Sequence, residues 1–117
     1  LVMFLVLRYV ASMQIEAETQ VDPMEAAATE AADVLKTLSN PARLRLLCAL
    51  VPQDRTVGEL EDLLGTSQAY VSGQLKRLRE EGIVGFEVNG RERRYRLKDP
   101  RVKPILERLY EVFCPAD

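Results

Sequence analysis

Apolar residues recur at helical spacing early in the chain and predict a helix over residues 23–38. Asp22 supplies a capping side chain, Pro23 suits the first helical position, and Glu25 places an acid in the first turn. The apolar positions that follow are Met24, Ala27, Ala28, Ala31, Val34, Leu35 and Leu38. Several of these residues are small, which permits a close approach to another helix.

A second helix is predicted to begin at Pro41, because Asn40 is a good capping residue and proline suits the first helical position. Pro52 ends this helix. Its expected inner face consists of Ala42, Leu44, Leu47, Cys48 and Val51. A cysteine therefore lies among the apolar residues of this helix.

Residues 56–82 predict two short helices that are joined by a turn. Thr56 and Glu59 form a capping box for the first of them, and Gly65 ends it. Ser67 caps the second helix, which Gly82 ends. The expected inward residues are Leu60, Leu63 and Leu64 in the first helix and Val71, Leu75 and Leu78 in the second. This arrangement indicates a helix-turn-helix.

A β-hairpin is predicted to follow. Its first strand contains the loosely alternating residues Ile83, Val84, Phe86 and Val88. Asn89-Gly90 is a strong signal for a two-residue hairpin turn, and residues 93–97 form the returning strand. The hairpin carries several arginines and corresponds to a basic wing.

A last helix is predicted to begin near Asp99, Pro100 and Pro104 and to end before Cys114 and Pro115. Its expected inward residues are Ile105, Leu106, Leu109, Val112 and Phe113. A chain of 117 residues has a modest core that does not need both the first and the last helix. We expect these helices to pair with a second copy; the alternative is that they close the core of one chain.

The order of the elements predicts a mainly α fold with a small β-hairpin. We expect a winged helix-turn-helix of order α-α-α-α-β-β-α, forming a homodimer through its first and last helices, in a domain over residues 22–117. Residues 1–21 are expected to be a disordered or misannotated extension, with Met3 or Met13 as alternative starts. The apolar run in this extension is too short to span a bilayer and is a poor signal peptide, so we expect a cytoplasmic protein with no membrane partner.

Charge is unevenly distributed along the chain. The net charge is only −2, which argues against a general polyanion binder. However, residues 16–33 contain six acids and no Lys or Arg, whereas residues 76–98 carry eight Lys or Arg residues against four acids. Because the local field matters more than net charge for steering a nucleic acid, the predicted helix-turn-helix and hairpin are candidates for binding double-stranded DNA.

The second helix of the helix-turn-helix is expected to lie in the major groove with its first turns near the base edges. Glutamine and serine hydrogen-bond to bases, while lysine and arginine contact phosphates. The wing reaches a phosphate or the minor groove. The candidate DNA-binding residues are Ser67, Gln68, Tyr70, Ser72, Gln74, Lys76, Arg77, Arg91 and Arg93.

Simpler interpretations exist for some of these residues. Ser67 is also a helix cap, and Arg94, Arg96 and Lys98 are expected to be a solvated strand face. Winged helices also serve as protein-interaction modules, an alternative that the basic wing disfavours.

The chain contains two cysteines and no histidine. It is too poor in cysteine for a secreted disulfide scaffold, and without histidine a zinc site is unfavourable. Catalysis by a thiol enzyme lacks an activating base. We therefore expect no enzyme activity, no metal and no cofactor.

The residues from Ala32 to Cys114 resemble the ArsR/SmtB family of bacterial repressors. The resemblance is carried by LKTLSNPARLRLLCAL, by TVGELEDLLGTSQAYVSGQLKRLREEGIV and by the wing. It implies a homodimer that binds operator DNA and releases it when an inducer binds. The usual His of the recognition helix is replaced by Gln74.

The two familiar metal sites of this family are absent from the sequence. The stretch from Glu59 to Leu63 contains no Cys-x-Cys motif, and the last helix has no histidine ligand. What remains are Cys48 and Cys114, whose places and neighbours resemble the persulfide-responsive branch. The resemblance implies that reactive sulfur species link the two thiols through a disulfide or polysulfide and that the repressor then leaves its operator. Arg45, one turn before Cys48, is expected to help to lower a thiol pKa.

Other sensing mechanisms remain open at this point. The same fold serves repressors that respond to general oxidants, to a metal or to a small ligand. A lone cysteine on an apolar helix face also acts as a small buried hydrophobe. The two cysteines together favour the dithiol switch.

Overall fold

The computed structural model describes Met3, Leu5 and residues 22–115. Apart from Met3 and Leu5, the expected N-terminal extension therefore lies outside the described residues. The chain divides into two compact units, residues 1–37 and residues 38–117, which are described separately. The first unit holds most of α2 (Pro23–Leu38). The Asp22 side chain accepts a hydrogen bond from the backbone N–H of Met24 at 2.9 Å, which accounts for the predicted start of this helix.

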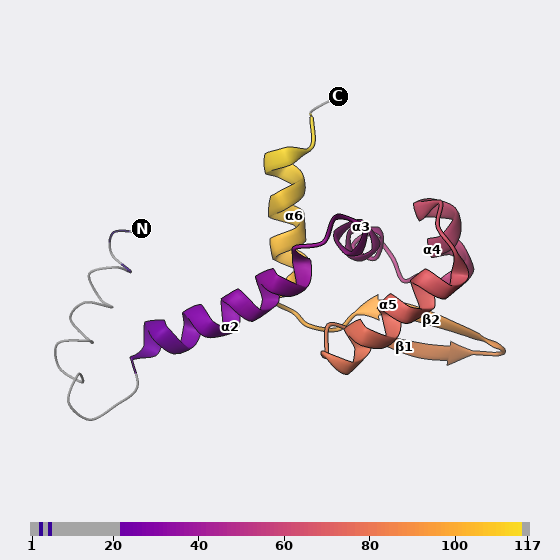
Figure 1. Cartoon of the computed structure of the whole chain (residues 1–117), viewed down its shortest axis with the longest axis horizontal. Helices are drawn as coiled ribbons and strands as arrows, with labels where there is room; N and C mark the ends of the chain where they lie inside the picture. The colour runs from indigo at the N-terminus through magenta and orange to yellow at the C-terminus, as the bar shows by residue number, and fades with distance from the viewer. Residues whose placement is uncertain (1–2, 4, 6–21, 116–117) are drawn as a thin grey trace. The chain divides into compact units, whose positions relative to one another are not determined.

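The second unit is a winged helix-turn-helix (Figure 1). Its elements are α3 (Pro41–Ala49), α4 (Val57–Leu64), α5 (Gln68–Glu80), β1 (Val84–Asn89), β2 (Glu92–Leu97) and α6 (Val102–Phe113). The helices α4 and α5 form the helix-turn-helix, and the β1–β2 hairpin follows α5 as the wing. Together with α2, these elements confirm the predicted order of the fold. Within the described residues, no helix is long and apolar enough to cross a membrane.

The predicted caps set the helix boundaries. Thr56 accepts a hydrogen bond from the N–H of Glu59 at 3.2 Å, while the Glu59 carboxylate accepts one from the N–H of Thr56 at 2.8 Å. Gly65 ends α4 in the left-handed conformation, with φ of 62°. Ser67 then caps α5 by accepting from the N–H of Tyr70 at 3.2 Å. Local hydrogen bonding therefore fixes the turn between the two helices.

The core of the second unit corrects part of the predicted helix faces. Its fully buried side chains are Leu46, Leu47, Leu60, Leu75, Leu78, Leu106, Val71, Val84 and Val102. Leu46 was not expected, and Ala42, expected inside, is exposed. The reason is that α3 contacts both α4 and α6 and so buries neighbouring residues on two sides. Leu63 was also expected inside but is 49% exposed.

The wing is joined to the helix-turn-helix by a backbone pairing that no sequence pattern predicts. The strands β1 and β2 pair antiparallel from Val84↔Leu97 to Asn89↔Glu92. Arg55, just before α4, forms a β-bridge with Tyr95 of β2. The backbone N of Arg55 lies 3.0 Å from the Tyr95 carbonyl oxygen, and the backbone N of Tyr95 lies 2.8 Å from the Arg55 carbonyl oxygen. A bridge of one residue has no sequence periodicity, so the hydrophobic pattern cannot reveal it. It holds the base of the hairpin against the start of α4.

The last helix is amphipathic, but its second half does not face the core of the chain. Val102 and Leu106 are buried, which places the core contact in the first half of α6. Val112 and Phe113, expected inside, are 58% and 77% exposed, and Tyr110 is 65% exposed. Three large apolar or aromatic side chains are therefore uncovered in the single chain.

The stability of α5 should increase when Gly73 is replaced by alanine. Gly73 lies inside the helix, and a Cβ added there has no protein atom within 4 Å. Alanine removes the entropic cost of glycine without a clash, so Gly73→Ala should raise the free energy of unfolding by about 0.5–1 kcal/mol. Urea denaturation followed by circular dichroism measures this change. A loss of stability would show that the side chain meets an obstacle at this position.

Candidate nucleic-acid interface and cysteine pair

One face of α5 is exposed, with uncharged residues in its first half and basic residues further along. Gln68, Ala69 and Gly73 are exposed in its first half, and Lys76 and Arg77 are exposed further along. The Gln68 amide nitrogen lies 3.4 Å from the Ser72 hydroxyl oxygen, to which it donates a hydrogen bond. Small side chains permit close approach to base edges, and cations further along are suited to phosphate contacts. This face fits the expected orientation of a recognition helix.

Two of the candidate DNA-binding residues are turned toward α3. Gln74 is half-buried, and its side-chain oxygen accepts a hydrogen bond from Arg43 Nε at 3.1 Å. Tyr70, one turn earlier, is also half-buried. It lines a cavity of about 180 Å³ together with Ala42, Arg45, Leu64 and Thr66. These two residues share a helix face between the core and the open surface, which helical spacing alone did not distinguish.

One wing arginine, Arg93, lies beside an aromatic ring. Arg91 and Arg93 are exposed at and beside the hairpin turn. The guanidinium of Arg93 lies 4.5 Å from the centroid of the Phe86 ring, and that of Arg79 in α5 lies 5.1 Å from the same centroid. Cation–π contacts of this kind orient guanidinium groups without neutralising them. Arg79 was missed from the sequence because its link to the wing requires the fold.

Arg94 connects the wing to α4 and is more than a solvated residue. Its guanidinium lies 3.3 Å from a Glu59 carboxylate oxygen and also donates to the backbone carbonyl of Asp54 at 3.4 Å. The backbone hydrogen bond from Thr56 is the main cause of the lowered pKa of Glu59, and Arg94 lowers it further. Because both partners are partly exposed, the ion pair contributes little stability. It links β2 to the start of α4.

The two cysteines lie on different helices of the second unit and are free thiols. Cys48 is half-buried in α3, whereas Cys114 is exposed at the end of α6. Burial raises the pKa of the Cys48 thiol, and its charge interaction with Cys114 raises this pKa further. The fold therefore brings the two thiols within electrostatic range. The expected help from Arg45 is wrong for Cys48, because burial dominates.

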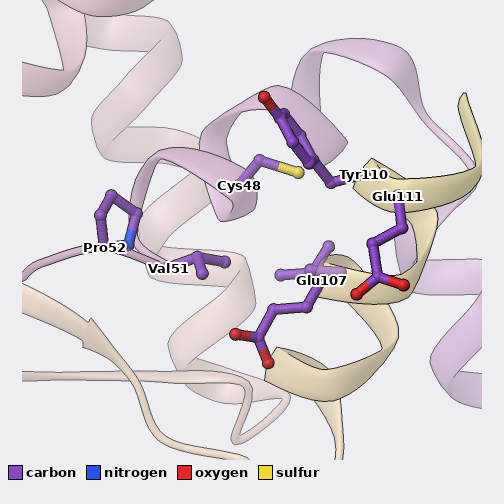
Figure 2. Close-up of a pocket in the computed structure, with 7 residues that line it drawn as sticks. Cys48, Val51, Pro52, Glu107, Tyr110 and Glu111 are labelled. Carbon is purple, nitrogen blue, oxygen red and sulfur yellow. The ribbon is translucent and has the colours of Figure 1, made fainter. Parts of the chain in front are cut away.

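A cavity of about 500 Å³ opens beside Cys48. Cys48 lines it together with Val51, Pro52, Leu106, Glu107, Tyr110 and Glu111. Figure 2 shows the Cys48 sulfur pointing toward α6, next to Tyr110, with the two carboxylates arising from the same helix. Neither the cavity nor its carboxylates were predicted, because the lining comes from two segments far apart in the sequence.

Comparison with known proteins decides the family. Residues 40–85 match the family described as bacterial regulatory protein, arsR family. The biofilm growth-associated repressor of Xylella fastidiosa is 44% identical over 96 residues, which cover 82% of this chain and 84% of that protein. The chain belongs to the ArsR family. It is therefore a transcriptional regulator and not an enzyme.

Solved structures of relatives share the fold of this ArsR-family chain. The repressor BigR from Xylella fastidiosa has a TM-score of 0.74 at 44% identity, covering 80% of this chain and 95% of that one. Reduced HlyU from Vibrio cholerae has a TM-score of 0.75 at 33% identity, covering 81% and 100%. A homodimeric winged helix-turn-helix domain from Mycobacterium bovis has a TM-score of 0.68 at 26% identity, covering 81% and 88%.

The acidic and thiol groups of this ArsR-family chain do not gather into a metal site where the structure describes them. Among Met3, Leu5 and residues 22–115, no cluster of three or more Cys, His, Asp or Glu residues is placed to hold a metal ion. The reactive and polar groups that line the cavity are therefore the Cys48 thiol, the Tyr110 phenol and the carboxylates of Glu107 and Glu111.

The raised pKa of Cys48 gives a testable pH profile. Because the thiolate is the nucleophile, alkylation of Cys48 by iodoacetamide should have its midpoint above the ordinary range of a cysteine. Cys114→Ser should move this midpoint down but leave it raised, since burial is the larger cause. Peptide mass spectrometry across pH measures the Cys48 rate alone. A midpoint at or below the ordinary value would contradict the burial of this thiol.

Proposed function

We propose that the protein is a dimeric transcriptional repressor that binds operator DNA when reduced and releases it when reactive sulfur species link Cys48 and Cys114. The observation that carries this proposal is the placement of the two thiols: the Cys48 sulfur in α3 points toward α6, and Cys114 caps the end of that helix. These residues are the only cysteines of the sequence. In this proposal the protein acts in the cytoplasm, where its operator lies.

The DNA contacts in this proposal come from α5 and the wing. The residues that read bases are Gln68 and Ser72, while Ser67, Lys76 and Arg77 contact the backbone. Arg91 and Arg93 reach a phosphate or the neighbouring minor groove from the hairpin. Tyr70 and Gln74 act as positioning residues, since both face α3 and Gln74 accepts a hydrogen bond from Arg43.

The proposed dimer uses the exposed part of α6 together with α2. Val112 and Phe113 form an exposed apolar surface at the end of α6 that a second copy would cover. The Mycobacterium bovis relative is homodimeric, which supports the same assembly here. A two-fold dimer places two recognition helices about one turn of DNA apart and so fits a palindromic operator.

The proposed chemistry needs no oxidant other than the sulfur donor. The Cys48 thiolate attacks the outer sulfur of a persulfide R–S–S–H, the S–S bond breaks, and R–S⁻ leaves and takes up a proton. The Cys114 thiolate then attacks Cys48 Sγ, which gives a disulfide and expels hydrosulfide. If a second sulfur is transferred first, attack on the middle sulfur gives a trisulfide and again expels hydrosulfide. A plain disulfide requires Cα atoms within about 7 Å, whereas added sulfurs span more.

A covalent link would couple α6 to the helix-turn-helix through α3. The helix α3 contacts both α6 and α4, and Arg43 of α3 hydrogen-bonds to Gln74 of α5. A shift of α3 would therefore change the positions of α4 and α5, the two helices of the helix-turn-helix. Only about 1.4 kcal/mol of differential stability between the two states is needed for a tenfold loss of DNA affinity.

The DNA surface is tested by the salt dependence of binding. Arg77→Gln and Arg91→Gln should each weaken binding and reduce the slope of log affinity against log salt by about 0.9, because each removes one phosphate contact. Lys103→Gln, an exposed cation on α6, is the matched control and should change nothing. Fluorescence anisotropy with an operator fragment measures the slopes. Equal slopes for all variants would point to a protein-interaction module.

The switch is tested by removing each thiol. Cys48→Ser and Cys114→Ser should bind DNA as the unmodified protein does but remain bound after treatment with a persulfide donor, since neither can form the link. Gel shift reports release, and mass spectrometry reports a mass gain of whole sulfur atoms or the loss of two hydrogens.

Three donors separate the alternatives for this switch. Release by persulfide but not by peroxide or oxidised glutathione supports sulfur sensing. Release by all three indicates a general oxidant sensor. Release of either serine variant by persulfide would refute the dithiol switch.

A further inference from the structure

The cavity beside Cys48 is larger than a hydrosulfide ion or a single sulfur atom requires. Its volume of about 500 Å³ lies within the range of small-molecule sites. Val51, Pro52 and Leu106 supply an apolar lining, and the Tyr110 ring stands next to the Cys48 sulfur (Figure 2). Such a lining suits an organic group whose sulfur is presented to Cys48.

Two carboxylates border this cavity on its α6 side. Glu107 and Glu111 lie one helical turn apart on α6, and both line the cavity. Glu111 is paired with Arg108 at 2.8 Å, although both side chains are largely exposed. Glu107 has no ion pair with any residue that the structure describes. The charges of Glu107, Arg108 and Glu111 therefore leave a net negative charge at the α6 rim of the cavity, where the organic group of a bound donor would lie.

We propose that this cavity binds the organic part of the sulfur donor and that Glu107, with a smaller contribution from Glu111, selects neutral or cationic organic persulfides over anionic ones. This inference rests on the proposed function and specifies its inducer. The sulfur transfer is the step described above: Cys48 takes the outer sulfur of R–S–S–H, and R–SH leaves. The group R lies against Val51, Pro52 and Leu106 during this step.

Small persulfide donors of different charge test whether the carboxylates at the cavity affect the rate of sulfur transfer to Cys48. The probes are the persulfides of cysteamine, 2-mercaptoethanol and 3-mercaptopropionate. Their organic groups R carry an ammonium, a neutral hydroxyl and a carboxylate, respectively. The full-length Cys114→Ser variant isolates the first transfer to Cys48, and mass spectrometry follows its rate. One unit charge about 6 Å away in water changes a rate about threefold, so each step in donor charge should change the rate by about that factor in low salt. The order should be cation, neutral, anion.

Charge-neutral variants identify the source of the discrimination. Glu107→Gln should bring the rates of the cationic and anionic donors several-fold closer together, whereas Glu111→Gln should do so less, because Arg108 already offsets that carboxylate. Glu80→Gln, at the exposed end of α5, is the matched control and should leave all three rates unchanged. Added salt should weaken the discrimination.

The apolar lining is tested by filling it. Val51→Phe should slow transfer from benzyl persulfide several-fold while leaving transfer from the smaller 2-mercaptoethanol persulfide nearly unchanged, because only the larger group needs the space. DNA binding and circular dichroism of this variant establish that it folds. Equal slowing of both donors in a folded variant would overturn the binding of R in this cavity.

The outcomes separate this inference from the function on which it rests. If all three charged donors react at one rate, or if Glu107→Gln changes no rate, charge selection is overturned while the dithiol switch stands. If Cys48 takes sulfur from no donor, the proposed switch itself fails.

Discussion

The packing of α3 on two sides is the constraint on which the rest of the second unit depends. Leu46 and Leu47 are adjacent in sequence and both fully buried, because α3 contacts α4 on one side and α6 on another. The same short helix carries Cys48, and its Ala49 carbonyl accepts a hydrogen bond from Arg55 at 2.6 Å. Because the buried residues of α3 pack against both neighbours, a displacement of this helix would be transmitted to α4 and α6.

This arrangement links two surfaces of different chemistry. Arg43 of α3 donates a hydrogen bond to Gln74 of the basic helix α5. Arg55, which follows α3 in the sequence, pairs with Tyr95 of the wing. Cys48 of α3 opens onto a cavity bordered by carboxylates of α6. A basic surface suits a polyanion, and an acidic cavity suits a neutral or cationic small molecule. The two proposed ligands are thus kept apart by charge as well as by position.

The two cysteines differ in burial, and this difference affects the reactivity of each thiol. Partial burial raises the pKa of the Cys48 thiol, so a smaller fraction of it is thiolate at a given pH than for an exposed cysteine. The exposed Cys114 has open access, and its position at the end of α6 leaves it close enough to interact with Cys48. Because the nucleophilicity of a thiolate rises with its pKa, a buried thiol that does lose its proton is a strong nucleophile. In the proposed switch, low general reactivity of Cys48 is therefore compatible with sulfur transfer from a bound donor.

The sequence by itself determined the order and boundaries of the elements, because caps such as Thr56 with Glu59 and turns such as Asn89-Gly90 act between near neighbours. The resemblance to the ArsR family was also readable, and the comparisons confirm it. Only the tertiary structure decided which helix faces are covered: it buried Leu46, exposed Leu63 and Phe113, and turned Tyr70 and Gln74 toward α3. It alone also brought Glu107 and Glu111 to the cavity that Cys48 lines. Periodicity shows that a helix has an apolar side, but burial and charge at a site depend on which segments meet there, and that is set by packing between residues far apart in the sequence.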